Sequence, residues 1–170
     1  MTTEFEAADI HVAQRLTALA GETSAEVTLA VQLAVRALRG GSVCVDLRAA
    51  APEAGLVAEE WLAAVAASPL AADPPVLRLF GDLLYLDRYW LEEEQVYADV
   101  LALVSTRPPG ELPDVLRLFP DEWAEQRAAA RRALTQGLTV LTGGPGTGKT
   151  TTVARLLALL VEQAALAGRA

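Results

Sequence analysis

The sequence has few of the residues that build disulfides, metal sites or membrane spans. Its single cysteine, Cys44, excludes an internal disulfide and a cysteine-based zinc site. Its single histidine, His11, leaves no Cys–His cluster for a soft metal. The apolar runs are shorter than the roughly 20 residues of a membrane helix. No basic segment precedes an apolar block near the amino terminus, as a secretory signal would require. We therefore expect a cytoplasmic protein that does not contact a membrane.

Positive charge is also scarce in most of the chain. Residues 1–110 hold 16 Asp and Glu against 7 Arg, whereas residues 111–170 hold 6 acids against 7 bases. An acidic surface repels the phosphate backbone of nucleic acids. The first part of the chain is therefore better suited to contact a protein than a duplex.

The chain is 52% hydrophobic and rich in Leu and Ala, which favours a packed, mainly helical protein. We expect the helix boundaries from the spacing of apolar residues and from residues typical of helix ends. Ser24 and Asp121 are expected N-caps, Glu92–Glu94 mark a helix start, and glycines mark helix ends. The expected helices are 5–20, 24–39, 56–67, 92–105, 121–136 and 151–168. Short apolar runs predict buried strands at 42–47 and 138–142.

A β-hairpin is expected where the apolar runs 76–80 and 83–89 flank the turn residues Gly81 and Asp82. The segment 107–113 contains three prolines and one glycine and lies where the charge balance changes sign. Such composition is typical of a linker. We therefore predict a first domain over 1–110 and a second over 111–170.

The only lysine of the chain, Lys149, lies in the sequence GGPGTGKT at 143–150, which fits the P-loop pattern G-x-x-x-x-G-K-[ST]. Glycines allow backbone N–H groups to approach a triphosphate closely, and the helix that follows directs its positive end at the same phosphates. Lys149 is expected to contact the β- and γ-phosphate oxygens and act in catalysis, and the Thr150 hydroxyl to ligate Mg²⁺. The predicted contacts to ATP come from Gly143, Gly144, Pro145, Gly146, Thr147, Gly148, Lys149, Thr150 and Thr151.

Gln126 lies 23 residues before Lys149, on the helix expected before the P-loop. A glutamine amide donates and accepts hydrogen bonds at once, which matches N6 and N7 of adenine. Gln126 is therefore a candidate for adenine recognition, although an ordinary solvated glutamine is the alternative.

The segment 122–160, EWAEQRAAARRALTQGLTVLTGGPGTGKTTTVARLLALL, resembles the start of the motor domain of superfamily 1 helicases. It is most similar to that of the RecD family, the alpha subunits of exodeoxyribonuclease V (RecBCD). GGSVCVDL at 40–47 and PPVLRLFGDLLYLDRYW at 74–90 look like segments of RecD amino-terminal domains. The likeness implies an α/β protein with a mainly helical amino-terminal domain and a small β-hairpin, followed by the start of a P-loop (RecA-like) parallel-sheet domain.

By this resemblance the chain is part of an ATP-dependent 5′-to-3′ DNA helicase subunit. It would work with RecB and RecC, as a heterotrimer, on DNA ends in recombinational repair of double-strand breaks. Only 21 residues follow Lys149. They leave no room for the acidic Walker B residue, the water-positioning residue or the second motor lobe of such an enzyme. We expect an amino-terminal fragment that does not hydrolyse ATP alone. Another P-loop ATPase, stand-alone RecD-like or AAA-type, and a non-catalytic partner-binding module are the alternatives.

Overall fold

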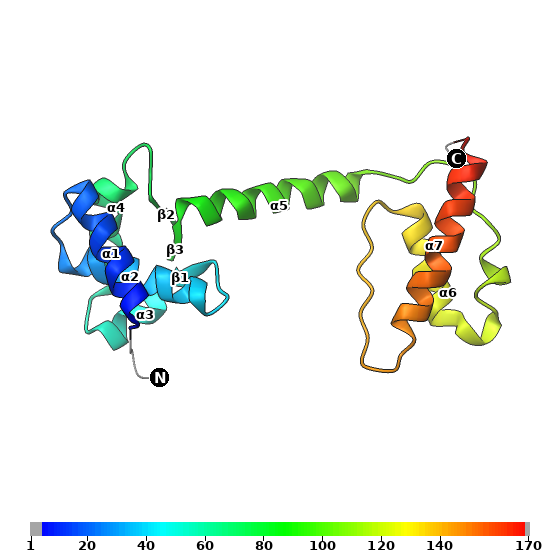
Figure 1. Ribbon diagram of the computed structural model, residues 1–170, viewed down its shortest axis with the longest axis horizontal. Coiled ribbons are helices and arrows are strands. Elements are labelled where there is room, and N and C mark those ends of the chain that lie inside the picture. Colours follow the sequence, from blue (N-terminus) through cyan, green and yellow to red (C-terminus); the bar gives the residue numbers. More distant parts are fainter. Residues whose placement is uncertain (1–4, 169–170) are drawn as a thin grey trace. The chain divides into compact units, whose positions relative to one another are not determined.

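The computed structural model describes residues 5–168, which belong to two compact units, Met1–Gln95 and Val96–Ala170. Figure 1 shows each unit as its own group of helices, with the small sheet in the first. The domain boundary expected after residue 110 remains a prediction. Among the described residues, no helix is long and apolar enough to cross a membrane.

The first unit is a helical layer packed on a small antiparallel sheet. Its strands lie in the order β1-β3-β2, and Cys44 faces Tyr85 while Leu79 faces Leu84 in the register. In chain order its elements are α1 (Ala7–Ala20), α2 (Ala25–Arg39), β1 (Cys44–Asp46), α3 (Leu47–Ala54), α4 (Ala58–Ala67), η1 (Pro69–Ala71), β2 (Leu77–Phe80) and β3 (Leu83–Leu86). Helix α5 (Asp87–Ser105) begins in this unit and continues into the second.

Most of the expected elements of this unit are confirmed, but the buried strand expected at 42–47 is only β1 (Cys44–Asp46), which is half-buried to exposed. Ser24 caps α2, since its hydroxyl accepts a hydrogen bond from the Val27 N–H at 3.2 Å. Gly21 ends α1 in the left-handed conformation, at φ 69°. The hairpin turns at Gly81 and Asp82, as predicted. The helix α3 was not expected. It begins where the Asp46 carboxylate accepts a hydrogen bond from the Ala49 N–H at 2.9 Å.

The expected end of the hairpin and the expected start of α5 at Glu92 are both wrong. The chain becomes helical at Asp87, directly after β3. The Asp87 carboxylate pairs with Arg78 at 2.6 Å and lies at the helix amino terminus, where a negative charge is favourable. Trp90 then packs against Tyr85 and Phe80, with ring centroids 5.1 and 5.0 Å away. These contacts between elements bring the helix start forward by one and a half turns.

The core of the first unit lies between α2, α4 and the sheet. Trp61 is 1% exposed, and its indole N–H donates a hydrogen bond to the Glu26 carbonyl at 2.8 Å. The buried residues around it are Ala13, Val27, Ala30, Val31, Leu33, Ala34, Val35, Leu47, Ala51, Val65, Leu70, Leu77 and Leu84. The indole thus joins α4 to the first turn of α2.

An ion pair between a buried carboxylate, Asp9, and an exposed guanidinium, Arg39, joins the start of α1 to the end of α2. Asp9 is fully buried and accepts two hydrogen bonds from Arg39, at 2.7 and 2.8 Å. A further hydrogen bond comes from the Glu6 N–H at 3.0 Å. The Arg39 hydrogen bonds are the main reason that the pKa of the Asp9 carboxyl lies below its ordinary value.

The second unit contains the second part of α5, η2 (Val115–Arg117), η3 (Asp121–Trp123), α6 (Ala124–Thr135) and α7 (Lys149–Leu166). Helices α6 and α7 contact each other. Their core consists of Val115, Phe119, Ala130, Leu134 and Leu159. The expected cap at Asp121 is wrong: this residue lies in η3 and pairs with Arg127, and α6 begins after Trp123.

The predicted strand 138–142 is not a strand in this structure. Within residues 5–168 no other strand pairs with it, and a strand needs a ladder partner. It runs instead as irregular chain from α6 to α7. The hydroxyl of Thr139 in this segment is buried and has no hydrogen-bond partner among the described residues.

The proline-rich segment 107–113 lies in the second unit and packs on α7. A Cβ atom on Gly110 would lie only 3.0 Å from the Gln163 carbonyl oxygen of α7, so the backbone approaches the helix closely. The Gly137 N–H donates a hydrogen bond to the Thr106 carbonyl at 3.2 Å. The residue just before this segment is thereby tied to the chain just after α6.

Replacing Trp61 with Ala is expected to lower the free energy of unfolding by about 3–5 kcal/mol, because it leaves a cavity and removes the hydrogen bond to Glu26. Urea denaturation followed by circular dichroism measures the loss. Leu19→Ala is the control, since Leu19 is 79% exposed, and it should change stability by about 0.5 kcal/mol or less. Equal effects would contradict the proposed core.

The Asp9–Arg39 pair predicts a specific acid sensitivity. The folded-state pKa of Asp9 is depressed, so its contribution to stability is complete above about pH 5. It is lost as the pH falls below about 4, the ordinary aspartate value. Asp9→Asn should lower the stability at neutral pH and should make the loss of stability below pH 4 less steep. Thermal unfolding at a series of pH values measures both effects. Asp73→Asn, in an exposed loop, should keep the wild-type slope.

Candidate nucleotide-binding site

The glycine loop lies between the irregular segment 138–142 and the start of α7. Gly146 and Gly148 both have φ 77°, a conformation that residues with a Cβ rarely adopt. Gly148 is the N-cap of α7, and its carbonyl accepts hydrogen bonds from the Thr152 N–H at 2.8 Å and the Thr152 hydroxyl at 3.0 Å. Glycine at 148 therefore allows the loop to turn directly into the helix.

A second glycine of the loop is required by space. A Cβ atom on Gly143 would lie 2.8 Å from the Thr147 hydroxyl oxygen, closer than such atoms come in proteins. That hydroxyl donates a hydrogen bond to the Gly144 carbonyl at 2.9 Å and so closes the loop on itself. The side of the loop at 143–144 is thus bare backbone, as close approach to a phosphate group requires.

Lys149 is the first residue of α7, and its ammonium reaches back over the loop. It donates hydrogen bonds to the carbonyl oxygens of Gly143 and of Gly144, the latter at 2.7 Å. The positive end of the 18-residue helix α7 and the Lys149 ammonium thus both place positive charge beside the glycine loop. The arrangement attracts anions.

The structure brings the predicted adenine and phosphate residues to one cavity of about 300 Å³. Gln126, in the first turn of α6, lines it together with Gly143, Thr147 and Lys149. Gly144, Pro145, Gly146, Gly148, Thr150 and Thr151 are exposed in the loop and first helical turn and do not line this cavity.

Several lining residues were not predicted: Glu125, Ala129, Val140, Leu141, Thr142 and Thr152. The sequence signal for these residues was their position next to Gln126 or next to the loop. That signal does not select the lining residues, because consecutive residues of a helix face different directions. Glu125 adds a carboxylate to the wall, which is a hydrogen-bond acceptor for hydroxyl or amino groups.

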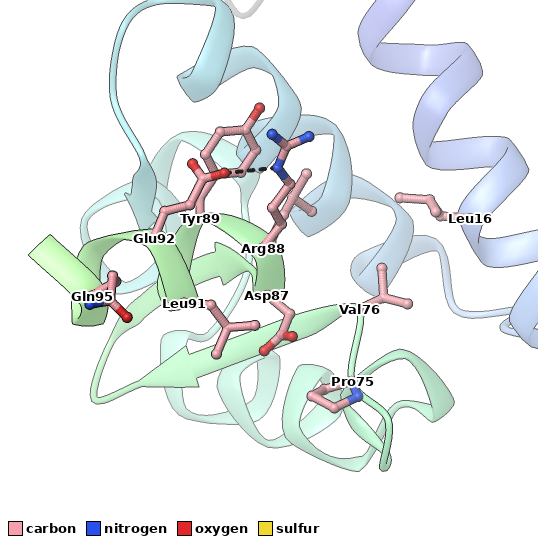
Figure 2. A pocket seen from close by; sticks show the side chains of 10 residues that line it. Leu16, Pro75, Val76, Asp87, Arg88, Tyr89, Leu91, Glu92 and Gln95 are labelled. Atoms are coloured by element: carbon pink, nitrogen blue, oxygen red, sulfur yellow. Dashed lines mark hydrogen bonds and ion pairs between the residues drawn. The ribbon is translucent and has the colours of Figure 1, made fainter.

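A larger, more open cavity of about 750 Å³ lies in the first unit, between α1, the loop before β2 and the start of α5. Figure 2 shows Leu16, Val76 and Leu91 among its mainly apolar walls. Its charged side chains are already paired, Arg88 with Glu92 at 2.9 Å and Asp87 with Arg78. It lacks the convergent polar groups of the loop cavity. In the range 5–168, no cluster of His, Cys, Asp and Glu is arranged to hold a metal.

The glycine loop and the helix that follows it in the second unit have the sequence pattern of a P-loop, and residues 126–169 match the family model of the AAA domain. Residues 2–85 match the model of the amino-terminal domain of the RecBCD enzyme subunit RecD. Over 170 aligned residues and 96% of this chain, it is 72% identical to the RecBCD enzyme subunit RecD of Mycolicibacterium smegmatis. It is 65% identical to the same subunit of Mycobacterium tuberculosis strains CDC 1551 and H37Rv.

The chain belongs to the RecD family. It spans about a third of the length of these relatives, 31% of the first and 30% of the others.

Replacing Gly148 with Ala is expected to strain the start of α7 by about 1–2 kcal/mol, because an alanine must then adopt φ 77°. The Thr152 amide, bonded to the Gly148 carbonyl, should exchange with deuterium about tenfold faster. Gly144→Ala is the matched control: its Cβ would meet nothing within 4 Å and its φ is not positive. Equal exchange rates would show that the glycine at 148 is not required by conformation.

Proposed function

We propose that this chain forms the ATP-binding portion of a RecD-type subunit of exodeoxyribonuclease V. The observation that carries the proposal is the shared cavity, which Gln126 and Lys149 enter from two different helices. An amide able to pair with adenine and an ammonium able to neutralise phosphate lie on the walls of one volume. The RecD relatives give this site its biological setting.

The residues of the loop fit ATP with Mg²⁺. The phosphates would be held by the backbone at 143–144, by the positive end of α7 and by Lys149. Gly146 and Gly148 permit the turn of the loop that this arrangement requires. The exposed Thr150 hydroxyl, in the first turn of α7, is available to ligate the ion. Bound Mg²⁺ would neutralise charge on the β- and γ-phosphates.

We further propose that the whole protein uses ATP to move 5′ to 3′ along DNA. It would act with RecB and RecC at DNA ends in double-strand break repair. In this assignment residues 1–110 form the partner-docking domain and residues 111–170 the start of the motor. The acidic balance of residues 1–110 supports contact with protein rather than with DNA.

The chain of 170 residues is proposed to bind ATP without hydrolysing it. Between Lys149 and Ala170 the only acid is Glu162, and its carboxylate pairs with Arg117 far along α7 from the loop. It therefore does not substitute for the acidic residue that a P-loop motor uses to hold Mg²⁺.

Two substitutions separate recognition of the base from recognition of the phosphates. In the whole protein, Lys149→Ala should weaken ATP and GTP alike by about 10- to 100-fold, the effect of one charged hydrogen bond. Gln126→Ala should weaken ATP by about tenfold and leave GTP unchanged. Titration with fluorescent nucleotides measures both affinities. Gln14→Ala, on an exposed site of α1, is the control. Unaltered ATP affinity in Lys149→Ala would refute the proposal.

A further inference from the structure

The two halves of the proposed nucleotide site stand on separate helices. Gln126 belongs to the first turn of α6, and Lys149 begins α7. One nucleotide contacts both groups only if the start of α6 is held at a fixed place relative to the start of α7. Within the described residues, Trp123 is the N-cap of α6, and its side chain makes no capping hydrogen bond. The pair of Arg127 with Asp121 joins the first turn of α6 to η3 but not to α7, so the connection to α7 must come from another contact.

Arg155 makes that connection from α7. It lies six residues after Lys149, and its guanidinium carbon is 3.9 Å from the centre of the Trp123 ring. Its Nη1 also donates a hydrogen bond to the Leu118 carbonyl at 3.0 Å. Trp123 directly precedes α6 and is three residues before Gln126. One side chain of α7 thus holds the residue from which the Gln126 helix starts.

The chemistry of arginine suits this double contact. A planar guanidinium stacks on an aromatic ring and at the same time donates in its own plane, whereas a lysine ammonium has no plane. Arg155 is half-buried and has a fixed environment, because Trp123 and Leu118 both pack against the core of Phe119, Ala130 and Leu159. By contrast, Arg131 and Arg132 on α6 are exposed.

We propose that Arg155 is a positioning residue that sets the place of Gln126 relative to the loop 143–150, and thereby the preference of the site for adenine. This inference rests on the proposed function. It adds a residue outside the loop and the cavity, since Arg155 is not among the residues that line it. Loss of Arg155 is expected to leave the loop and Lys149 in place and to remove this tie between α7 and the start of α6, which the pair of Asp121 with Arg127 still joins to η3.

The test compares three ligands in the whole protein: ATP, inosine triphosphate and inorganic tripolyphosphate. Inosine lacks the N6 amino group that Gln126 is proposed to read, and tripolyphosphate lacks the base. In the wild type, ATP should bind about tenfold more tightly than inosine triphosphate. In Arg155→Met the affinities for ATP and inosine triphosphate should differ by less than about twofold. The affinity for tripolyphosphate should change by less than about twofold from the wild type.

Two further variants keep the result interpretable. Arg155→Lys retains the charge over the ring and loses the planar donor, so its ratio should be intermediate. Arg155→Lys also replaces Arg155→Met in the test if Arg155→Met does not fold. A thermal melt of each variant shows whether it is folded. Arg131→Met, an exposed arginine on α6, should keep the wild-type ratio.

Each outcome has one meaning. A wild-type ATP-to-inosine ratio in folded Arg155 variants overturns the positioning role. A parallel loss of all three ligands overturns it too, since that result describes a general structural role. If the wild type binds neither ATP nor tripolyphosphate, the proposed function itself fails. If it binds both without preferring ATP over inosine triphosphate, the adenine role of Gln126 fails and the role of Arg155 with it.

Discussion

The packing of α6 against α7 is the constraint on which the candidate site depends. Ala130, Leu134 and Leu159 form the apolar contact, and Gln163 adds a hydrogen bond from its amide to the Leu134 carbonyl at 3.2 Å. A loop rich in glycine binds nothing selectively by itself, because backbone N–H groups recognise any anion. In the proposed function, selectivity for the base comes from Gln126, which a second helix brings to the same cavity.

The features that depend on local chemistry could be predicted from the sequence. The cap at Ser24, the stop at Gly21, the turn at Gly81–Asp82 and the helix after Gly148 all follow from residue types and spacing. Gln126 was singled out by its spacing to Lys149 and its amide chemistry, and it lines one cavity with Gly143, Thr147 and Lys149; its role in adenine recognition stays a prediction.

The features that depend on distant contacts could not be predicted. The start of α5 at Asp87 rests on the ion pair with Arg78 of β2 and on the ring contacts of Trp90 with residues of β2 and β3. The segment 138–142 has the composition of a strand, but a strand forms only when a second segment pairs with it through backbone hydrogen bonds. The contact of Arg155 with Trp123 joins residues 32 positions apart and leaves no pattern in the sequence.

The unusual composition of the chain makes its proposed site chemically addressable. Lys149 carries the only side-chain amine among 170 residues, and that amine is bonded to the carbonyl oxygens of two loop glycines. An amine-directed reagent applied to this polypeptide has one side chain to modify, with the terminal amine as the other target. The rate of acylation of that lysine therefore reports on the accessibility of its amine beside the glycine loop, with no engineered label.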